Sequence, residues 1–479
     1  MFSVSFRHGG TRAAIAALTL FLFTAVSLVP LGPAWALTLS EENKIGRLLL
    51  TQVRKQMPLI EDGDILTYVR GVANRVAKEV GISPYQYQFF IIDKGIPNAF
   101  AVPGGYIFMF RGLIEMMASE GELASIFAHE IAHIQARHIH RRMEEGKVLG
   151  IAGLAGALAG IFLGGAGMGQ MAPAIAVGSM AASTTAALRY SRAHEMEADQ
   201  LGFRFLCKAG YDPADMVSIM HKMDQIKWSG SSSIPSYLST HPALGERVLY
   251  LKEMVKKQKA QAPKSKKAQV GDFPFLHAAL IADYDDQAKA YDRFQIGIKK
   301  GDKAAGFGLG RLYLRQEKTA EAAEQLRESA RMTQSPFVLS CLGSAYHRLG
   351  KLDEALRTFQ SALALDPSAS IVHYKMALVL QEKGQKSEAI EHLQQVEELA
   401  PMFPEVDYQL GILLGQTNRL GMAHYYLGRY YMAKQDTKLA LMHYKKAKGS
   451  VDSPAKIDEI SETLKVLETY KKESGNKGK

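Results

Sequence analysis

Two histidines and a glutamate within residues 127–133 have the types and spacing of a metal-dependent hydrolytic site. His129 and His133 are four residues apart, so on a helix both imidazoles lie about one turn apart on the same face and can reach one ion. In an H-E-x-x-H hydrolase the intervening glutamate, here Glu130, takes a proton from the water that zinc activates and does not bind the metal. We therefore expect one Zn²⁺ per chain, with Glu130 as the general base. A five-residue pattern also arises by chance, so the prediction depends on residues further along the chain.

Carboxylates that could complete such a site lie in residues 189–199. A zinc hydrolase needs a third protein ligand and an open fourth position, and Glu195 is the candidate that we favour. Asp199, one helical turn further on, could accept the free ring N–H of a ligating histidine and fix its orientation. The spacing alone leaves another interpretation open, a helix with a solvated acidic face on which Glu197 or no residue binds metal.

A His-Pro turn at His241 is the last candidate for this site. Such a turn can place an imidazole over the cleft, either to stabilise the oxyanion of a tetrahedral intermediate or to occupy the open zinc position and keep an enzyme latent. Arg247 could orient His241 or a substrate carboxylate. A turn with a purely structural role is the remaining alternative.

The histidines must be held by a helix, and the sequence marks its start. Ser119 and Glu122 form a capping-box pattern ahead of an apolar run, which predicts a helix beginning there. At 100° per residue the large apolar side chains of this helix share one arc, and His129 and His133 point away from it. The packing face and the chemical face are therefore separate.

A β-hairpin is predicted just before this helix. Residues 98–102 and 106–110 flank the turn Pro103-Gly104-Gly105, while residues 86–92 predict a further strand and residues 40–80 two amphipathic helices. A strand beside a metal cleft can bind an extended peptide by main-chain pairing, so its residues are candidates for substrate binding: Asn98, Phe100 and Ala101. A hairpin that only packs against the catalytic helix would have the same pattern.

Composition and charge place the chain among globular proteins of two or three domains. It has 479 residues, 47% hydrophobic and 22% charged, with a net charge of +10. The lysines gather in residues 256–270 and near the end without interleaved aromatic residues, which favours solubility or peripheral contact with an anionic membrane over nucleic-acid binding. The chain has only two cysteines, Cys207 and Cys341, which excludes a disulfide scaffold and leaves undecided whether these two form a single disulfide.

Two further segments concern the membrane. Residues 1–36 predict a signal peptide cleaved after Ala36 and therefore export to the periplasm, with an uncleaved anchor as the alternative. Residues 148–188 contain no Asp, Glu, Lys or Arg. They could form a membrane-embedded hairpin or small-residue helices packed inside a soluble domain, and we favour the second interpretation because glycines shorten each apolar half.

Internal repeats follow residues 256–272, which predict an exposed basic linker. Leu-Gly-x-x-Tyr occurs at 309, 342 and 427 with related positions between them, at spacings of 33 or 34 and finally 17. This period is typical of tetratricopeptide helix pairs, with a degenerate pair at 275–300 and one late helix shared by two repeats. Residues 273–470 are thus predicted to form an α-solenoid, a surface that binds polypeptide segments, and residues 471–479 a disordered tail.

Taken together, these motifs resemble the CAAX-prenyl-protease-type zinc metallopeptidases. The resemblance rests on four segments: His129-Glu130-x-x-His133, 98–106, Ser191-Arg192-x-x-Glu195-x-Glu197-Ala198-Asp199 and His241-Pro242. It implies a mainly α, gluzincin-type metalloprotease domain at 37–255 with a small β-hairpin or sheet, followed by the repeats. It also implies Glu195 as the third ligand, Asp199 as the residue that orients a ligand, and a structural role for His138.

The expected function is that of an exported zinc endopeptidase in cell-envelope quality control. The resemblance implies unfolded or stalled outer-membrane proteins as substrates and contact of the repeats with the outer-membrane assembly machinery. In this mechanism Glu130 accepts and later delivers a proton, and His241 stabilises the oxyanion. The alternatives are a solenoid-based chaperone or assembly factor with a latent protease site, and a membrane-anchored quality-control protease.

Overall fold

The computed structural model describes residues 38–145, 190–228, 237, 240–261, 272–400 and 403–476. The predicted signal peptide and the uncharged segment 148–188 lie outside the described residues. Within the described ranges, no helix combines the length and apolar composition needed to cross a membrane. Cys207 and Cys341 are both free thiols.

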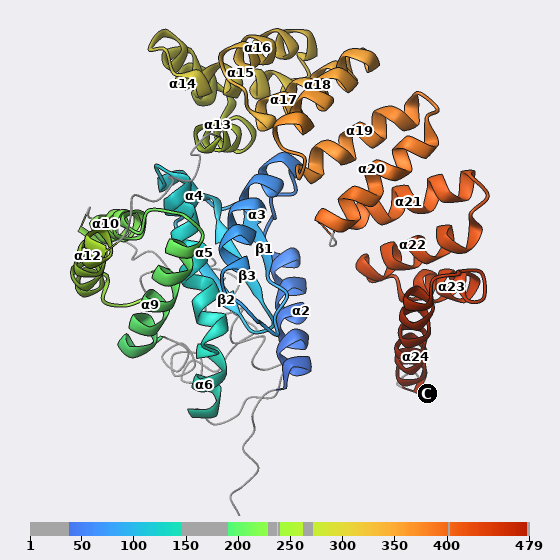
Figure 1. The fold of residues 1–479 in the computed structure, drawn as a ribbon, viewed down its shortest axis with the longest axis horizontal. Coiled ribbons are helices and arrows are strands. Elements are labelled where there is room, and N and C mark those ends of the chain that lie inside the picture. The colour runs from blue at the N-terminus through green and yellow to red at the C-terminus, as the bar shows by residue number, and fades with distance from the viewer. Residues whose placement is uncertain are drawn as a thin grey trace, which may run out of the picture.

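The N-terminal part of the chain is a helical domain built on a three-stranded sheet, and an α-solenoid follows it (Figure 1). The predicted fold class is confirmed. The elements of the first domain are α2 (Leu39–Gln56), α3 (Gly63–Lys78), β1 (Gln88–Ile92), β2 (Ala99–Val102), β3 (Tyr106–Phe110), α4 (Arg111–Met116), α5 (Glu120–Gln135), α6 (His138–Glu145), α9 (Arg192–Lys208), α10 (Ala214–Trp228) and α12 (Leu244–Gln261).

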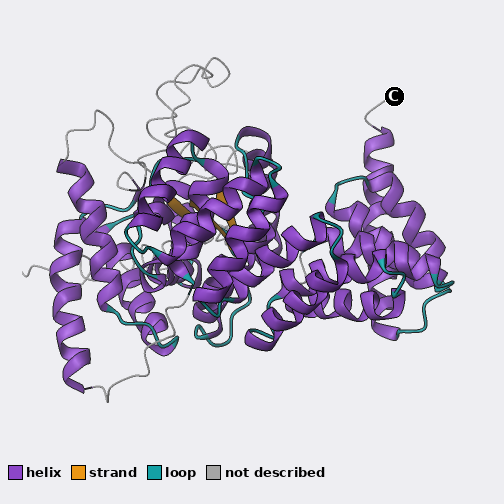
Figure 2. Cartoon of the chain, turned by 90° about the horizontal axis from the view of Figure 1, so that it is seen from above, coloured by secondary structure: helices purple, strands orange, loops and turns teal. Residues whose placement is uncertain are grey.

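The sheet contains the predicted hairpin. Its order is β1-β3-β2, with β3 parallel to β1 and antiparallel to β2. The turn between β2 and β3 requires glycine, because Gly104 and Gly105 have φ of +88° and +91° and a Cβ on Gly104 would lie 2.8 Å from the Glu42 carbonyl oxygen. Phe100 and Phe108 share a core with Ile45 of α2, while alternate residues of the strands join the core that contains α5. Helices therefore surround the strands on both faces (Figure 2).

Helix α5 begins where its capping residues predict. The Ser119 hydroxyl accepts a hydrogen bond from the Glu122 backbone N–H at 3.1 Å, but the Glu122 carboxylate accepts from Ala118 N–H instead of closing the box on Ser119. The helix is buried on all sides, because α9 crosses it closely. A Cβ on Gly202 of α9 would lie 3.0 Å from the carbonyl carbon and oxygen of Ala128. This close approach brings the start of α9 beside His129 and His133.

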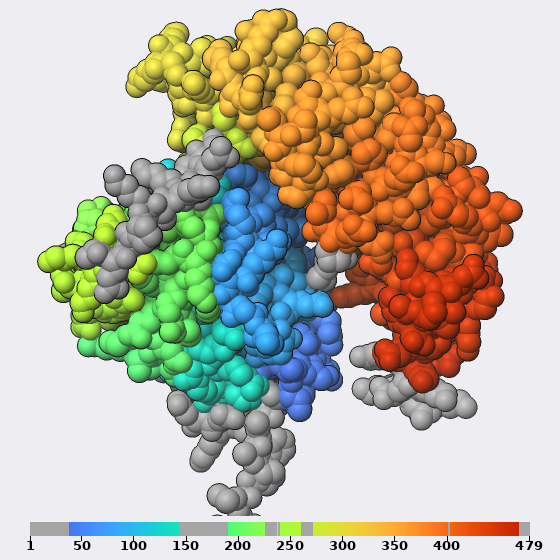
Figure 3. All heavy atoms as spheres, in the orientation of Figure 1, coloured from blue at the N-terminus to red at the C-terminus, as the bar shows by residue number. Residues whose placement is uncertain are grey.

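The solenoid consists of paired helices that curve around the first domain (Figures 1 and 3). Helix α22 packs against both α21 and α23, which explains the late spacing of 17, and α13 and α14 occupy the predicted degenerate pair. The elements are α13 (Phe273–Tyr284), α14 (Gln287–Lys299), α15 (Lys303–Arg315), α16 (Thr319–Met332), α17 (Pro336–Arg348), α18 (Leu352–Leu365), α19 (Ser370–Glu382), α20 (Lys386–Leu399), α21 (Pro404–Gln416), α22 (Leu420–Ala433), α23 (Thr437–Ala447) and α24 (Pro454–Asn476).

Two predicted irregular segments are partly helical. Helix α12 continues through residues 256–261 of the predicted linker, and α24 includes residues 471–476 of the predicted tail. Lysine has a good helix propensity, so a run of lysines does not end a helix that has already begun. The charge pattern indicated solvent exposure correctly for Lys256 and Lys257 but did not mark the helix end.

Candidate metal centre

Four side chains converge on one buried point between α5, α9 and the turn before α12. The Nε2 atoms of His129 and His133 are 3.0 Å apart, and Glu195 places a carboxylate oxygen 3.6 Å from the first and 3.4 Å from the second. His241 Nδ1 lies 3.3 Å from His129 Nε2 and 3.1 Å from Glu195 Oε1. One ligand atom from each residue lies within 4.8 Å of all the others, and all four residues are buried. Three imidazoles and a carboxylate are a donor set that suits zinc.

The local backbone structure orients each of these four side chains toward the same point. His129 and His133 lie one turn apart on α5. Glu195 lies in the first turn of α9, which is capped by Ser191, whose hydroxyl accepts from His194 N–H at 3.1 Å. His241 precedes a turn in which Ala243 has φ of +63°, immediately before α12. The three segments meet because α9 packs on α5 and Arg247 of α12 binds Asp199 and Glu195 of α9.

Asp199 and Arg247 hold His129 and Glu195 in place. Asp199 Oδ1 lies 2.9 Å from His129 Nδ1, which is the contact that its spacing predicted. Arg247 donates two hydrogen bonds to Asp199 at 2.7 Å and also binds Glu195, so it orients these carboxylates, whereas the sequence suggested that it would orient His241 or a substrate. Burial raises the pKa of Asp199, but Arg247 and His129 more than offset it and hold that pKa below its usual range. Asp199 thus remains a carboxylate that fixes Nδ1–H of His129 and leaves Nε2 for a metal.

His133 is oriented by His138, a role that sequence reasoning gave only as structural. Their Nδ1 atoms are 2.9 Å apart, and His138 Nε2 lies 3.2 Å from Glu197 Oε2. Burial lowers the pKa of His138 to about 4, so the ring is neutral and can share one proton with His133. Glu197 also binds Arg141 and is 43% exposed. The structure therefore places Glu197, the alternative third ligand, outside the centre.

Glu130 is buried beside this cluster without compensation from a hydrogen bond. Its side chain is 0% exposed, and neither carboxylate oxygen has a hydrogen-bond partner among the described residues. Burial raises the pKa of Glu130, partly opposed by His241 and His129. Glu130, Glu195 and Asp199 together with Arg247 give a formal charge of −2 when all are ionised, which one divalent cation would balance. Glu130 Oε1 lies 3.7 Å from His241 Nε2 but accepts no hydrogen bond from the described residues. The donor set, the charge and this carboxylate all fit a bound zinc ion.

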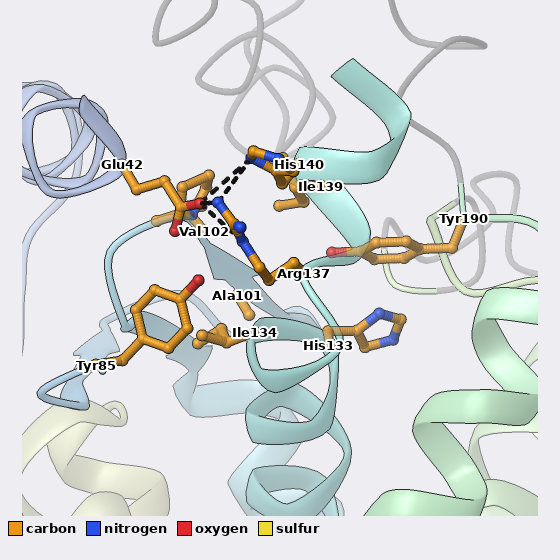
Figure 4. Close-up of a pocket in the computed structure, with 11 residues that line it drawn as sticks. Glu42, Tyr85, Ala101, Val102, His133, Ile134, Arg137, Ile139, His140 and Tyr190 are labelled. Carbon is orange, nitrogen blue, oxygen red and sulfur yellow. Dashed lines mark hydrogen bonds and ion pairs between the residues drawn. The ribbon is translucent and has the colours of Figure 1, made fainter. Parts of the chain in front are cut away.

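A small, partly open cleft adjoins the centre (Figure 4). Ala101, Val102 and Pro103 of the hairpin line one side, and His133 and Tyr190 line another.

The three predicted substrate-binding residues lie differently with respect to this cleft. Ala101 lines it. The Phe100 ring stacks on Phe108 at 5.0 Å inside the core, so that side chain is not available to a substrate. Asn98 is 1% exposed, and its amide has no hydrogen-bond partner among the described residues.

Two tyrosines beside the ligands were missed by sequence reasoning. The Tyr190 ring stacks on His133 with centroids 3.9 Å apart, and the Tyr237 ring stacks on His241 at 4.3 Å. Both hydroxyls are buried without a hydrogen-bond partner in the described part of the chain. Tyr190 directly precedes the capping residue Ser191, inside a segment whose pattern we interpreted only for its carboxylates.

Comparison with known proteins agrees with this geometry. The model of peptidase family M48 matches residues 66–255, and models of the TPR repeat and the tetratricopeptide repeat match residues 343–384 and 372–401. The chain carries an M48 metallopeptidase domain followed by tetratricopeptide repeats. The predicted class of enzyme is thereby confirmed, because the matched range contains the four converging residues.

Named relatives include proteins with both parts. The chain is 27% identical over 398 residues to the beta-barrel assembly-enhancing protease of Escherichia coli, covering 78% of each protein. It is 33% identical over 269 residues to a putative protein of that name from Vibrio cholerae, covering 56% of this chain and 54% of the relative. It is 28% identical over 189 residues to the mitochondrial metalloendopeptidase OMA1 of Schizosaccharomyces pombe, covering 39% of this chain and 52% of the relative. Among solved structures, the TPR protein YrrB covers 40% of this chain and 97% of its own at 19% identity, with a TM-score of 0.31.

Proposed function

We propose that this chain is a periplasmic zinc endopeptidase that cleaves unfolded or stalled outer-membrane proteins. The observation that carries the proposal is the convergence of His129, His133 and Glu195 beside the buried carboxylate of Glu130, which accepts no hydrogen bond from the described residues. Zinc held by these ligands would supply a Lewis acid that polarises a peptide carbonyl and makes water a nucleophile at neutral pH.

In this mechanism the residues of the chain move and hold protons. The Glu130 carboxylate takes a proton from the attacking water and returns it to the nitrogen of the leaving amine. Its raised pKa, caused mainly by burial, suits a group that must hold that proton between the two steps. Asp199 and Arg247 keep His129 and Glu195 in position throughout, because each is itself held by two or more hydrogen bonds.

His241 supports a latent resting state. Its Nδ1 lies among the ligand atoms, and its side chain is 0% exposed. We infer that His241 is a fourth ligand in this arrangement and must leave before a peptide can bind. The geometry therefore favours latency over the oxyanion role for His241 in the state described.

The substrate class rests on the relatives and on the solenoid. Two relatives are named for enhancing beta-barrel assembly, and a curved helical repeat offers a surface for polypeptide. We propose that the repeats contact the outer-membrane assembly machinery and that the predicted signal peptide delivers the chain to the periplasm. The net positive charge of the chain favours peripheral contact with an anionic membrane there. The buried centre also favours a second candidate, an assembly factor whose protease site stays latent.

The test replaces Glu130 by glutamine, which keeps the shape of the side chain but cannot accept the proton. Full-length Glu130→Gln protein should bind one zinc ion per chain and fail to cleave a purified unfolded outer-membrane protein. Glu246→Gln is the matched control, because that carboxylate is 64% exposed, pairs with Arg192 at the surface and has no contact with the centre, so this variant should retain cleavage. Retained cleavage by the Glu130 variant would refute the mechanism. If that variant still supports barrel assembly in cells, the assembly-factor function is favoured.

A further inference from the structure

One side chain of the metal centre has a hydrogen-bond donor with no use in the resting structure. Tyr190 is 3% exposed, and its hydroxyl has no hydrogen-bond partner among the described residues. A buried hydroxyl without a hydrogen bond is unfavourable, so its presence in the centre calls for an explanation. Its ring is fixed by the stack on His133, which is one of the proposed ligands.

The direction of the Tyr190 hydroxyl indicates what it could meet. Figure 4 shows the phenol above the His133 imidazole, with its oxygen directed into the cleft toward the side on which Ala101 and Arg137 lie. A peptide that pairs with β2 would pass through this space, since Ala101 and Val102 line it. The hydroxyl therefore faces the part of the cleft that such a peptide would occupy.

Several other donors near the centre already make hydrogen bonds. Arg137 binds Glu42 at 2.5 Å, and Arg247 binds Asp199 and Glu195. His241 Nδ1 is directed at Glu195, and His241 Nε2, which has no hydrogen-bond partner among the described residues, lies 3.7 Å from Glu130 Oε1 and is not among the residues that line the cleft. Tyr237 has a free hydroxyl too, but its ring covers His241 and it does not line the cleft.

We propose that Tyr190 is a catalytic residue whose hydroxyl donates a hydrogen bond to the oxyanion of the tetrahedral intermediate. The inference rests on the proposed peptidase function and adds a residue to it. When water adds to the carbonyl, a C–O bond forms and the π electrons move to the carbonyl oxygen, while Glu130 takes the proton. Tyr190 donates to that oxygen without losing its own proton, and collapse breaks the C–N bond as Glu130 protonates the amine.

A donor that meets charge only in the transition state accelerates the reaction without strengthening substrate binding. A neutral phenol is suited to this site because it adds no charge to a centre whose carboxylates and guanidinium already balance a divalent cation. Because its stack on His133 restricts the ring, the hydroxyl needs little reorganisation when the oxyanion forms.

The test is Tyr190→Phe, which keeps the ring and its stack and removes only the hydroxyl. Loss of one oxyanion donor lowers kcat by about 100- to 1,000-fold in a well-studied hydrolase, so we expect a fall of about 100-fold with KM changed by less than about threefold. Zinc content and thermal stability should match the wild type. A phosphinic peptide, which mimics the tetrahedral intermediate, should bind the zinc-loaded variant more weakly by a similar factor, while a product peptide should bind equally well.

Tyr237→Phe is the matched control, because its hydroxyl is also buried without a hydrogen-bond partner among the described residues but does not line the cleft. It should bind the phosphinic peptide as the wild type does. Wild-type kcat and phosphinic-peptide affinity in Tyr190→Phe would overturn the inference while leaving the peptidase function intact, and so would equal losses in both variants or a loss explained by missing zinc. A wild-type protein that neither cleaves nor binds the phosphinic peptide would overturn the proposed function and this inference together.

Discussion

The buried carboxylate of Asp64 links the protease domain to the solenoid. It lies in the first turn of α3 and is 6% exposed. Lys375 Nζ of α19 donates to both of its oxygens at 2.8 and 2.7 Å, and the Ser340 hydroxyl of α17 donates at 2.6 Å. Arg311 of α15 lies 3.6 Å away. The helices α15, α17 and α19 of the solenoid therefore all contact one residue of the protease domain.

Removing Lys375 should destabilise the folded chain by about 2 kcal/mol. Breaking a buried ion pair typically costs about 3–5 kcal/mol, but Arg311 and Ser340 would still compensate Asp64, so a smaller value is expected. Asp64→Asn should cost about 1 kcal/mol, because the Lys375 side chain is 18% exposed and can turn its ammonium toward water. The double variant should cost less than the sum of the two single variants, by about 1–2 kcal/mol of coupling.

Denaturant unfolding of the full chain, followed by intrinsic fluorescence and circular dichroism, measures this cycle. Hydrogen exchange in the first turn of α3 should rise in Lys375→Met, because the interface is then easier to open. Lys383→Met is a suitable control, since that lysine binds Asp353 within the solenoid at its exposed face and should cost less than about 1 kcal/mol. Additive losses in the cycle, with unchanged exchange in α3, would show that the contact contributes nothing to the interface.

Two further predictions concern packing and pH. Gly202→Ala should lower the free energy of unfolding by about 1–3 kcal/mol and weaken zinc binding, because the new Cβ would press on the backbone of Ala128 and His129 and move α9 away from α5. Gly71→Ala in α3 is the control, because nothing lies within 4 Å of its Cβ, and it should stabilise the chain by about 0.5–1 kcal/mol. Denaturant unfolding and zinc titration measure both effects. Burial, opposed by Arg429 and assisted by Glu397, raises the pKa of Asp407 to about 7 from an ordinary 3.8. The folded chain therefore holds a proton that the unfolded chain releases between about pH 4 and 7, so stability falls across this window as pH rises, by at most about 4 kcal/mol. Asp407→Asn should flatten that fall in unfolding measurements at pH 5 and pH 8, and an unchanged slope would contradict the assigned cause.

The residues that sequence could place are those whose relation is local. His129 and His133 need only one helix, so their spacing was enough, and the contact between Asp199 and His129 followed from one further turn on α9. The solenoid could be predicted because each repeat has similar residues at the positions that pack against neighbouring helices. The hairpin was visible because Gly104 and Gly105 permit its turn.

What sequence could not place depends on how separate elements approach each other. Arg247 was noticed, but its partners follow from the position of α12 against α9, and Tyr190 became significant only once it was seen to lie on His133. Phe100 was predicted to contact a substrate through main-chain pairing, and nothing in the sequence pattern showed that its ring packs in the core shared with α2. The helical continuations of α12 and α24 were missed because a run of lysines predicts exposure and not backbone conformation.

Helix α3 contacts both the solenoid and the helices that carry the metal centre. Its first turn is held by α15, α17 and α19 through Asp62 and Asp64, while the rest of the helix packs on α5 and α9, which carry the three proposed ligands other than His241. The solenoid therefore does more than follow the protease domain in sequence, because its inner face forms the support of a helix that lies against the metal-binding helices. A partner that changes the curvature of α15 to α19 would act on α3 first, and through α3 on the spacing of α5 and α9. Metal affinity measured in the Lys375→Met variant tests this directly, since a solenoid that served only to recruit partners would leave zinc binding unchanged.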